Sequence, residues 1–158
     1  MTTNLDARFA SYSSPALSIF RIVAGLMFIL HGTQKVFQWP APTPMPIPVG
    51  SFPAWWAGLI ELVCGVLITV GFFTRIAAFI AAGEMAIAYF WMHWPPLEGP
   101  PASFWPTVNG GELALLYCFG FLAIAGMGAG AWSVDARRRP VAAAAGGAPR
   151  RRFGRFRR

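Results

Sequence analysis

The amino-acid sequence predicts an all-α integral membrane protein, a four-helix bundle that crosses the bilayer four times with both chain ends in the cytoplasm. Three observations support this prediction. Apolar residues make up 56% of the 158-residue chain, charged residues only 12%, and the mean hydropathy is +0.51. A water-soluble domain carries about twice that charged fraction. The other two observations are four long apolar stretches and an uneven distribution of Lys and Arg.

The four apolar stretches approach the length of a membrane span. An α-helix rises about 1.5 Å per residue and needs ~20 residues to cross ~30 Å of hydrocarbon. Lipid offers no partner to an unpaired backbone N–H or C=O, so only helices and closed barrels span it. These continuous stretches lack the alternation of barrel strands. We therefore expect membrane helices at residues 16–37, 53–73, 76–94 and 109–132.

The connections between the expected helices differ in length and composition. Little more than Thr74 and Arg75 separates the second helix from the third, which requires an antiparallel hairpin with a basic tip. The other two connections, 38–52 and 95–108, are long, rich in proline and poor in basic residues. Because proline disfavours helix, we expect both to be extended segments on the exterior face.

Positive charge lies mainly on one side of the expected bundle. Arg8 precedes the first helix, Arg75 lies in the short hairpin, and the cluster 137–139 follows the fourth helix. Lys35 is alone on the opposite side. The positive-inside rule therefore places both termini in the cytoplasm. The first stretch is too long and too rich in charged residues for a typical signal peptide, so we expect it to be retained.

We divide the chain into a cytoplasmic segment at 1–15, a transmembrane domain at 16–135 and a disordered Arg-rich cytoplasmic tail at 136–158. Nine of the 13 Lys and Arg residues lie in the tail, so the formal charge of +7 does not describe the membrane domain. We expect the tail to lie against anionic membrane lipid, at about 1 kcal/mol per basic residue. Nucleic acid is not an expected partner.

The two cysteines, Cys64 and Cys118, lie singly within apolar stretches, without a second cysteine or a histidine at metal-ligand spacing. We therefore expect neither a metal site nor disulfide exchange. The sequence also carries no flavin or haem motif, so no covalently bound cofactor is expected.

Polar and ionisable residues inside the apolar stretches are the candidates for function. A charge near the bilayer centre costs about 2.5 to 3.5 kcal/mol on insertion scales, so each one should face a partner or water within the bundle. Counting inward from the exterior boundary gives one group at similar depth, in the outer half. Its members, a candidate ligand-binding cluster, are His31, Lys35, Glu61, Asn109 and Glu112.

Arg21 lies in the inner half and needs an acidic partner. Glu84, near the middle of the third helix, and Asp135, at the inner boundary, are within reach of a long guanidinium stem. We therefore expect structural ion pairs among these three residues. His93 follows Glu84 by nine residues, about half a turn out of phase, so we expect it to point away from Glu84 and lie at the interface.

Two interpretations of the buried charges remain open. In the first, they form an ion-pair network that only fixes which helix faces which. In the second, His31, Lys35, Glu61 and Glu112 line a polar pocket that opens outward and binds a small molecule or relays protons.

Three segments are familiar in their order, RIVAGLMFILHGTQKVF, GLIELVCGVLITVGFFTRIAA and NGGELALLYCFGFLAIAGMGAGAWSVD. With them the chain resembles the DoxX family of small bacterial four-span membrane proteins, from about residue 15 to residue 135. The matching residues are Arg21, Gly25, His31, Gly32, Lys35, Gly58, Glu61, Gly65, Gly71, Thr74, Arg75, Asn109, Glu112, Tyr117 and Asp135.

The resemblance implies a multi-pass protein of the bacterial inner membrane. The family is named by similarity to a subunit of a thiosulfate:quinone oxidoreductase, and some members are thought to act in membrane-associated redox and thiol-stress complexes. A link to quinones or sulfur compounds is therefore implied, whereas no catalytic residue is.

Three functions are compatible with these observations. The first is the small membrane subunit of a quinone-linked oxidoreductase, with Lys35 or His31 bonding a quinone oxygen, Glu61 or Glu112 exchanging its proton, and a redox enzyme partner carrying electrons. The second is a non-catalytic scaffold or assembly factor. The third and least favoured is a transporter of a small anion, which would need a homo-oligomer because the chain shows no inverted repeat.

The expected topology can be tested with alkaline phosphatase fusions, because the enzyme is active only outside the cytoplasm. Fusions after Pro46 and after Pro100 should be active, and fusions after Arg75 and after Arg139 inactive. The reverse pattern would overturn the orientation, and activity after Arg139 alone would show that one span has been miscounted.

Overall fold

The structure is a computed structural model that describes residues 2–94 and 103–138. All regular structure within these residues is helical, which confirms the all-α class for the described part of the chain. The helices overlap the apolar stretches, and most of the described prolines lie outside them. In chain order they are α1 (Thr2–Phe37), α2 (Ala54–Val70), α3 (Thr74–Ala88), the π-helix η1 (Tyr89–His93), α4 (Pro106–Asn109) and α5 (Glu112–Met127).

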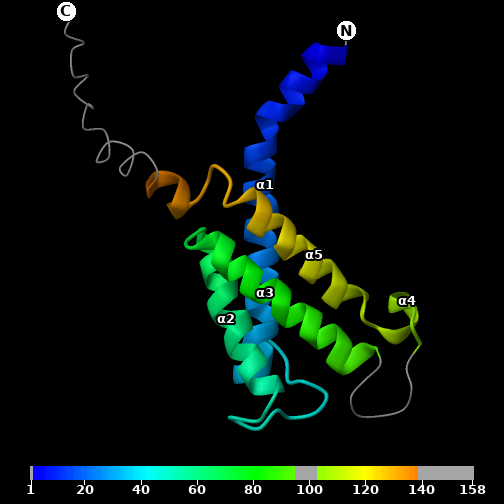
Figure 1. The fold of residues 1–158 in the computed structure, drawn as a ribbon. Helices are drawn as coiled ribbons and strands as arrows, with labels where there is room; N and C mark the ends of the chain where they lie inside the picture. Colours follow the sequence, from blue (N-terminus) through cyan, green and yellow to red (C-terminus); the bar gives the residue numbers. More distant parts are fainter. Residues whose placement is uncertain (1, 95–102, 139–158) are drawn as a thin grey trace, which may run out of the picture.

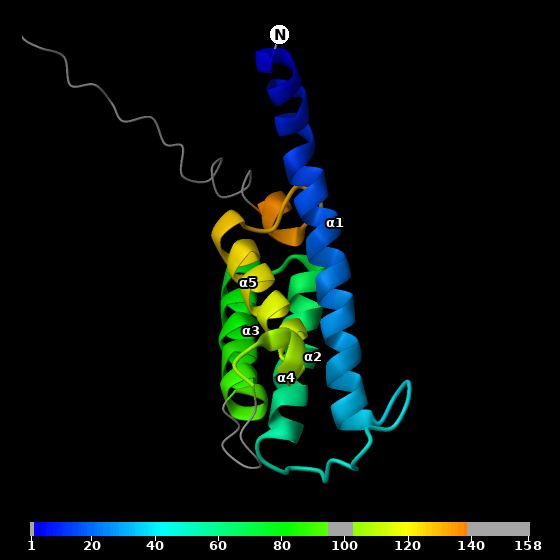
Figure 2. The same cartoon turned by 90° about the vertical axis from the view of Figure 1, so that its right-hand side faces the viewer.

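The helices α1, α2, α3 and α5 run alternately in opposite directions (Figures 1 and 2). Helix α1 packs along α2, α3 packs along α5, and α2 contacts α3, whereas α1 and α5 touch little. The start of α1, the α2–α3 turn with Arg75, and the residues after α5 lie together at one end, which we name the basic end. The opposite end carries residues 38–53 and 103–111, and we name it the loop end.

Two parts of the fold are long and apolar enough to cross a membrane, Tyr12–Phe37 within α1 and Thr74–His93, which joins α3 and η1. The apolar helices Ala54–Val70 and Glu112–Met127 are shorter, at 17 and 16 residues. Helix α1 also extends to Thr2, through the segment expected to precede the membrane.

Glycines allow the backbones of α1 and α2 to approach closely. A Cβ atom on Gly32 would lie 2.7 Å from the carbonyl oxygen of Gly58, and one on Gly65 would lie 3.0 Å from the backbone nitrogen of Ile29. No larger residue fits there without moving a helix. Gly58 and Gly65 share a helix face with Glu61, so this contact also brings the Glu61 side chain toward α1.

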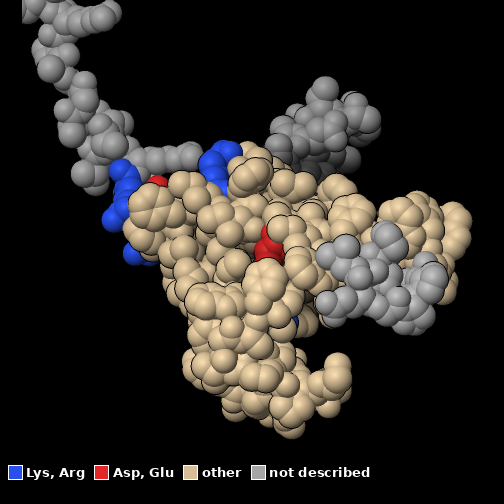
Figure 3. Space-filling model, turned by 60° about the horizontal axis from the view of Figure 1, so that its bottom comes forward, with Lys and Arg blue, Asp and Glu red and all other residues tan. Residues whose placement is uncertain are grey.

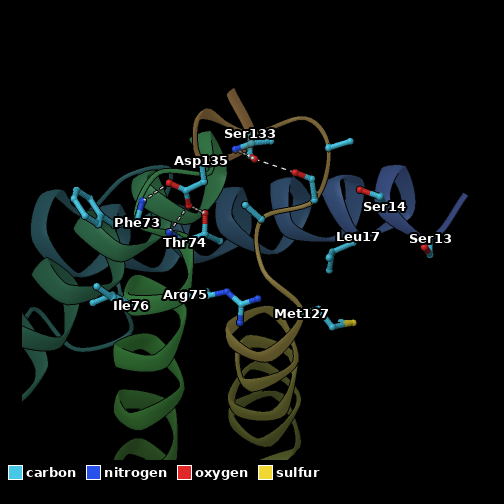
Figure 4. A pocket seen from close by; sticks show the side chains of 14 residues that line it. Ser13, Ser14, Leu17, Phe73, Thr74, Arg75, Ile76, Met127, Ser133 and Asp135 are labelled. Atoms are coloured by element: carbon cyan, nitrogen blue, oxygen red, sulfur yellow. Dashed lines mark hydrogen bonds between the residues drawn. The ribbon is translucent and has the colours of Figure 1, made fainter. Parts of the chain in front are cut away.

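Asp135, which follows α5 in the chain, caps the start of α3. Its carboxylate accepts hydrogen bonds from the backbone N–H of Phe73 at 3.1 Å, and from the N–H and the hydroxyl of Thr74 at 2.9 and 2.8 Å (Figure 4). Burial of the carboxyl acts to raise its pKa, but these hydrogen bonds hold the pKa of Asp135 below its ordinary value. Asp135 therefore stays ionised at neutral pH and caps a helix whose first N–H groups otherwise lack acceptors.

Helix α5 ends at Met127, earlier than the expected 132, because the glycines that follow adopt backbone angles that a helix does not allow. Gly128 has φ 97° and Gly130 has φ 73°. Gly130 lies where a Cβ atom would meet the hydroxyl of Ser18. The chain after α5 thus folds back across α1.

Arg21 is fully buried at 0% exposure, and its partners differ from those expected. Neither Glu84 nor Asp135 forms an ion pair with it among the described residues. The end of α2 presents carbonyl groups that have no intrahelical partner and carry partial negative charge, and the turn after α5 adds two more. The guanidinium donates to the carbonyl oxygens of Ile68, Thr69 (2.6 Å), Ala129 (2.7 Å) and Trp132 (2.7 Å).

Replacing Arg21 with Met should lower the free energy of unfolding by about 3 kcal/mol or more, because it leaves several buried carbonyl groups without donors. Arg75→Met is a matched control, since Arg75 also donates to carbonyls at a helix end, those of Ala125 and Gly126, but is exposed. Its cost should stay below about 1 kcal/mol. Thermal unfolding of both variants in detergent measures the difference, and equal losses would contradict a special role of Arg21.

Candidate functional site

A cavity of about 490 Å³ lies toward the loop end, between α1, α2, α3 and the start of α5. This size is typical of sites that bind small molecules. Most of its wall is apolar. We name it the polar cavity after the side chains that distinguish it, which are His31, Lys35, Glu61, Glu84, His93 and Tyr117.

Figure 3 views the molecule obliquely from the loop end. The surface in view is almost entirely uncharged, an acidic group shows near its middle, and basic side chains lie mainly at the far edge. The polar side chains of the cavity are therefore set among apolar surface, which strengthens electrostatic interactions between them.

Helical spacing explains which side chains reach the cavity. On α1, Phe28, His31 and Lys35 follow one another at three and four residues and so share a face. Glu84 and Trp91 share a face of α3 and η1 in the same way, at a spacing of seven residues. Each helix contributes one stripe of side chains.

His93 lines the cavity together with Glu84, although the sequence predicted that it would point away. The prediction assumed a continuous α-helix. Residues 89–93 instead form the π-helix η1, whose wider turn changes the direction in which its own last residue, His93, points. The Nδ1 atom of His93 lies 3.1 Å from the carbonyl oxygen of Asn109, which places the ring at the mouth of the cavity.

Lys35 and Glu61, two members of the predicted cluster, form an ion pair. The Lys35 Nζ atom lies 2.6 Å from Oε1 of Glu61. This contact is the one ion pair found among the residues that the structure describes. Glu61 is 2% exposed, whereas Lys35, nearer the mouth, is 28% exposed. The ammonium group keeps donors that Glu61 does not use.

Several buried polar atoms of the cavity have no hydrogen-bond partner within the described parts of the chain. They are both carboxylate oxygens of Glu84, the Oε2 atom of Glu61 and the hydroxyl of Tyr117. Glu61 and Lys35 lie close enough to Glu84 to act on it electrostatically. Buried polar groups in proteins are nearly always hydrogen-bonded, so this set is the strongest sign of a binding site in the fold.

Aromatic rings form one wall of the cavity. The Tyr117 ring lies edge-on to His31, at 5.7 Å between centroids, and 5.5 Å from the Phe28 ring. Trp91 lies on the η1 side of the cavity. These rings offer flat apolar surface beside the ionisable groups, an arrangement suited to a planar ring with polar substituents.

Asn109 and Glu112, two members of the predicted cluster, do not line the polar cavity. The Asn109 side chain ties the loop before α5 together, by donating to the carbonyl of Ser103 at 3.0 Å and accepting from the N–H of Gly111 at 2.8 Å. Glu112 is exposed at the first position of α5, where a negative charge is favourable. Depth alone placed it in the cluster, but it lies about 140° around the helix from Tyr117.

Glu84 and Tyr117 are two further residues of the cavity that the sequence prediction did not place there. Glu84 was assigned to Arg21, which is instead satisfied by backbone carbonyls. Tyr117 was noted among the family motifs without a role. Its i+3 spacing from Ala114, which also lines the cavity, is the signal that could have identified it.

The residues described by the structure contain no group of three or more His, Cys, Asp or Glu side chains that could hold a metal ion. Cys64 and Cys118 are both buried and free. The Lys, Glu, His and Tyr side chains of the polar cavity can form hydrogen bonds and exchange protons.

Comparison with known protein families shows that the chain belongs to the DoxX family. The DoxX family model matches residues 16–94. An uncharacterized protein of Haemophilus influenzae is 47% identical over 120 residues, which are 75% of this chain and 87% of that protein. An uncharacterized membrane protein of Mycobacterium tuberculosis, Rv3486, is 29% identical over 142 residues, 84% of this chain and 86% of that protein. No solved structure matches.

A double-mutant cycle tests the Lys35–Glu61 pair. Glu61→Leu and Lys35→Met should each destabilise the fold, because each leaves a buried partner uncompensated, and the double variant should be milder than the sum by about 1 kcal/mol or more. The same cycle for Glu61 and His31 is the control and should be close to additive, since no bond joins them. Strict additivity for Lys35 as well would show that the pair does not interact in solution.

Proposed function

We propose that this chain is the small membrane subunit of a quinone-linked redox complex. Two findings are compatible with the proposal: the chain belongs to the DoxX family, and a membrane protein is among the relatives of the chain. In this proposal the polar cavity receives the quinone head. The observation that carries it is the set of unpartnered buried oxygens of Glu61, Glu84 and Tyr117 beside an aromatic wall.

The proposal includes a multi-pass protein of the bacterial inner membrane with four spans and both termini in the cytoplasm. Its support is that four apolar helices alternate in direction, and that both ends of the described chain lie toward the end of the bundle that carries the α2–α3 turn. Helices α2 and α5, at 17 and 16 residues, are at or just below the shortest length that crosses hydrocarbon. Local thinning of the bilayer and flanking interfacial residues compensate for such a difference at modest cost.

The residues of the polar cavity fit the head of a quinone. Lys35 and Tyr117 supply donors for its carbonyl oxygens, and Glu84 and the Oε2 atom of Glu61 supply acceptors for the hydroxyls of its reduced form. Phe28, Trp91 and Tyr117 supply flat surface for the ring. A bound quinone supplies two-electron, two-proton redox chemistry.

In this proposal the side chains of the cavity divide the work of moving protons. Lys35 holds the Oε1 atom of Glu61 in an ion pair, and the Glu84 carboxyl group accepts and releases a proton. The imidazole of His93 exchanges protons with the aqueous side at the mouth of the cavity. These side chains transfer protons and not electrons, so the proposal includes a redox enzyme partner in the membrane.

A second candidate function is a non-catalytic scaffold or assembly factor. The four carbonyl bonds of Arg21 and the close contact of α1 with α2 favour it, because both show buried groups used only to hold helices together. Both observations concern helix packing rather than the polar cavity. The two functions are therefore separated by variants of the cavity alone.

Glu84→Gln keeps the shape of the side chain and removes its ability to accept and release a proton. We expect this variant to remain folded and abundant but to lose quinone-dependent activity in membranes by about 100-fold, the typical contribution of a general acid or base. Lys35→Met should show the same loss per amount of folded protein, because it also weakens the fold by breaking the ion pair with Glu61. Quinone reduction in membranes, and survival of a complemented deletion strain under oxidative and thiol stress, measure the effect.

Glu112→Gln provides the matched control, because it makes the same chemical change at an exposed position outside the cavity. It should leave activity and survival unchanged. Normal complementation by Glu84→Gln and Lys35→Met at wild-type abundance would rule out the quinone site and leave the scaffold function. Purification in mild detergent, with identification of co-purifying proteins and extractable quinone, tests the partner directly.

A further inference from the structure

A second hollow lies between α1 and α5, on the side where these helices touch little. Its volume is about 200 Å³, and nine residues line it. Apart from the ring of Tyr117, its wall is built from apolar side chains and glycine, including Phe20, Met27, Leu116 and Gly120. We name it the apolar groove. Phe20, Met27 and Leu116 are 47%, 48% and 65% exposed, so the groove opens to the lipid side of the fold.

The apolar groove adjoins the polar cavity. Leu113 and Tyr117 line both, the Tyr117 ring lying between the groove and the cavity. The Phe28 ring, on the cavity side, packs 4.7 Å from the ring of Phe121, on the groove side. A molecule that occupied both would place one end among ionisable groups and the other end among hydrocarbon side chains.

We propose that the apolar groove holds the hydrocarbon tail of a lipid-soluble ligand whose polar head lies in the polar cavity, and that the ligand enters from the bilayer between α1 and α5. The proposal deepens the proposed function, on which it rests only for the position of the head. The tail is assigned by the division of the wall, with ionisable side chains on one side of Tyr117 and hydrocarbon on the other. A sugar, an inorganic anion or a metal ion would leave the groove without a role.

Gly120 makes the groove testable, because a side chain there would fill it. A Cβ atom on Gly120 would meet only the far end of the Phe20 ring, at 3.3 Å, and no backbone. Gly120→Leu should therefore fold while closing the groove. The matched control is Gly83→Leu, which makes the same change on α3 at an exposed glycine where a Cβ atom meets nothing within 4 Å.

The experiment compares two probes on the full-length protein in mild detergent. One is a dimethoxy-methyl-benzoquinone with a ten-carbon tail, and the other is the same quinone without a tail. Quenching of tryptophan fluorescence reports binding of each. Gly120→Leu should weaken binding of the tailed probe about tenfold, since the loss of two buried methylene groups suffices for that change. Binding of the tailless probe, and both affinities of Gly83→Leu, should stay unchanged.

An unchanged affinity of Gly120→Leu for the tailed probe would overturn the assignment of the groove. Equal losses for both probes would overturn it as well, because the substitution would then act on the head site. If neither quinone binds the unaltered protein, the proposed function fails while the groove is still tested by a ten-carbon alkylamine with a photoreactive diazirine at the tail end. Labelling of residues 20–27 and 113–120 that is lost in Gly120→Leu supports the groove, and labelling without that loss overturns it.

Discussion

The carbonyl bonds of Arg21 are the interaction on which the rest of the structure depends. A guanidinium with 0% exposure needs partners for its donors, and it finds them at the end of α2 and in the turn after α5. Ser18, one turn earlier on α1, accepts from the N–H of Trp132 at 3.1 Å, next to the same turn. A single face of α1 therefore fixes where α2 ends and where the chain goes after α5.

The pairing of Arg21 with backbone carbonyls determines which acidic side chains remain available in the rest of the structure. Since backbone carbonyls compensate its charge, neither acid that could have paired with it is consumed. Asp135 is left to cap α3, which fixes the α2–α3 turn. Glu84 is left in the polar cavity without a hydrogen-bond partner among the residues that the structure describes. The packing of the basic end and the available carboxyl group of Glu84 in the polar cavity thus both follow from the pairing of Arg21 with backbone carbonyls.

The sequence predicted the all-α class because long apolar stretches without the alternation of strands favour helices. It also placed Lys35 and Glu61 in one cluster, since residue types and depth suffice for that. It did not predict the partners of Arg21, because backbone carbonyls at a helix end are not visible in residue types. Glu112 was misplaced for a related reason, since depth was counted without the direction in which the helix faces.

The end of α5 and the phase of His93 show a further limit. Both depend on local departures from α-helical geometry, at Gly128 and in η1, that hydrophobic periodicity does not reveal. The wide separation of α1 and α5 is likewise a property of packing. The polar cavity was therefore only partly predictable. Residue types and depth placed Lys35 and Glu61 together, but the extent of the cavity and the apolar groove beside it could not be predicted.

The two ends of the molecule differ in how they satisfy buried polar atoms, and this difference bears on function. Near the basic end, Arg21 and Asp135 have partners within the described chain. In the polar cavity, acidic oxygens of Glu61 and Glu84 do not. A fold that required only packing would be more stable with a leucine in place of Glu84, because burying a carboxyl group without a partner costs free energy that an apolar side chain does not. We therefore propose that a ligand or a proton uses the carboxyl group of Glu84, rather than the packing of the helices.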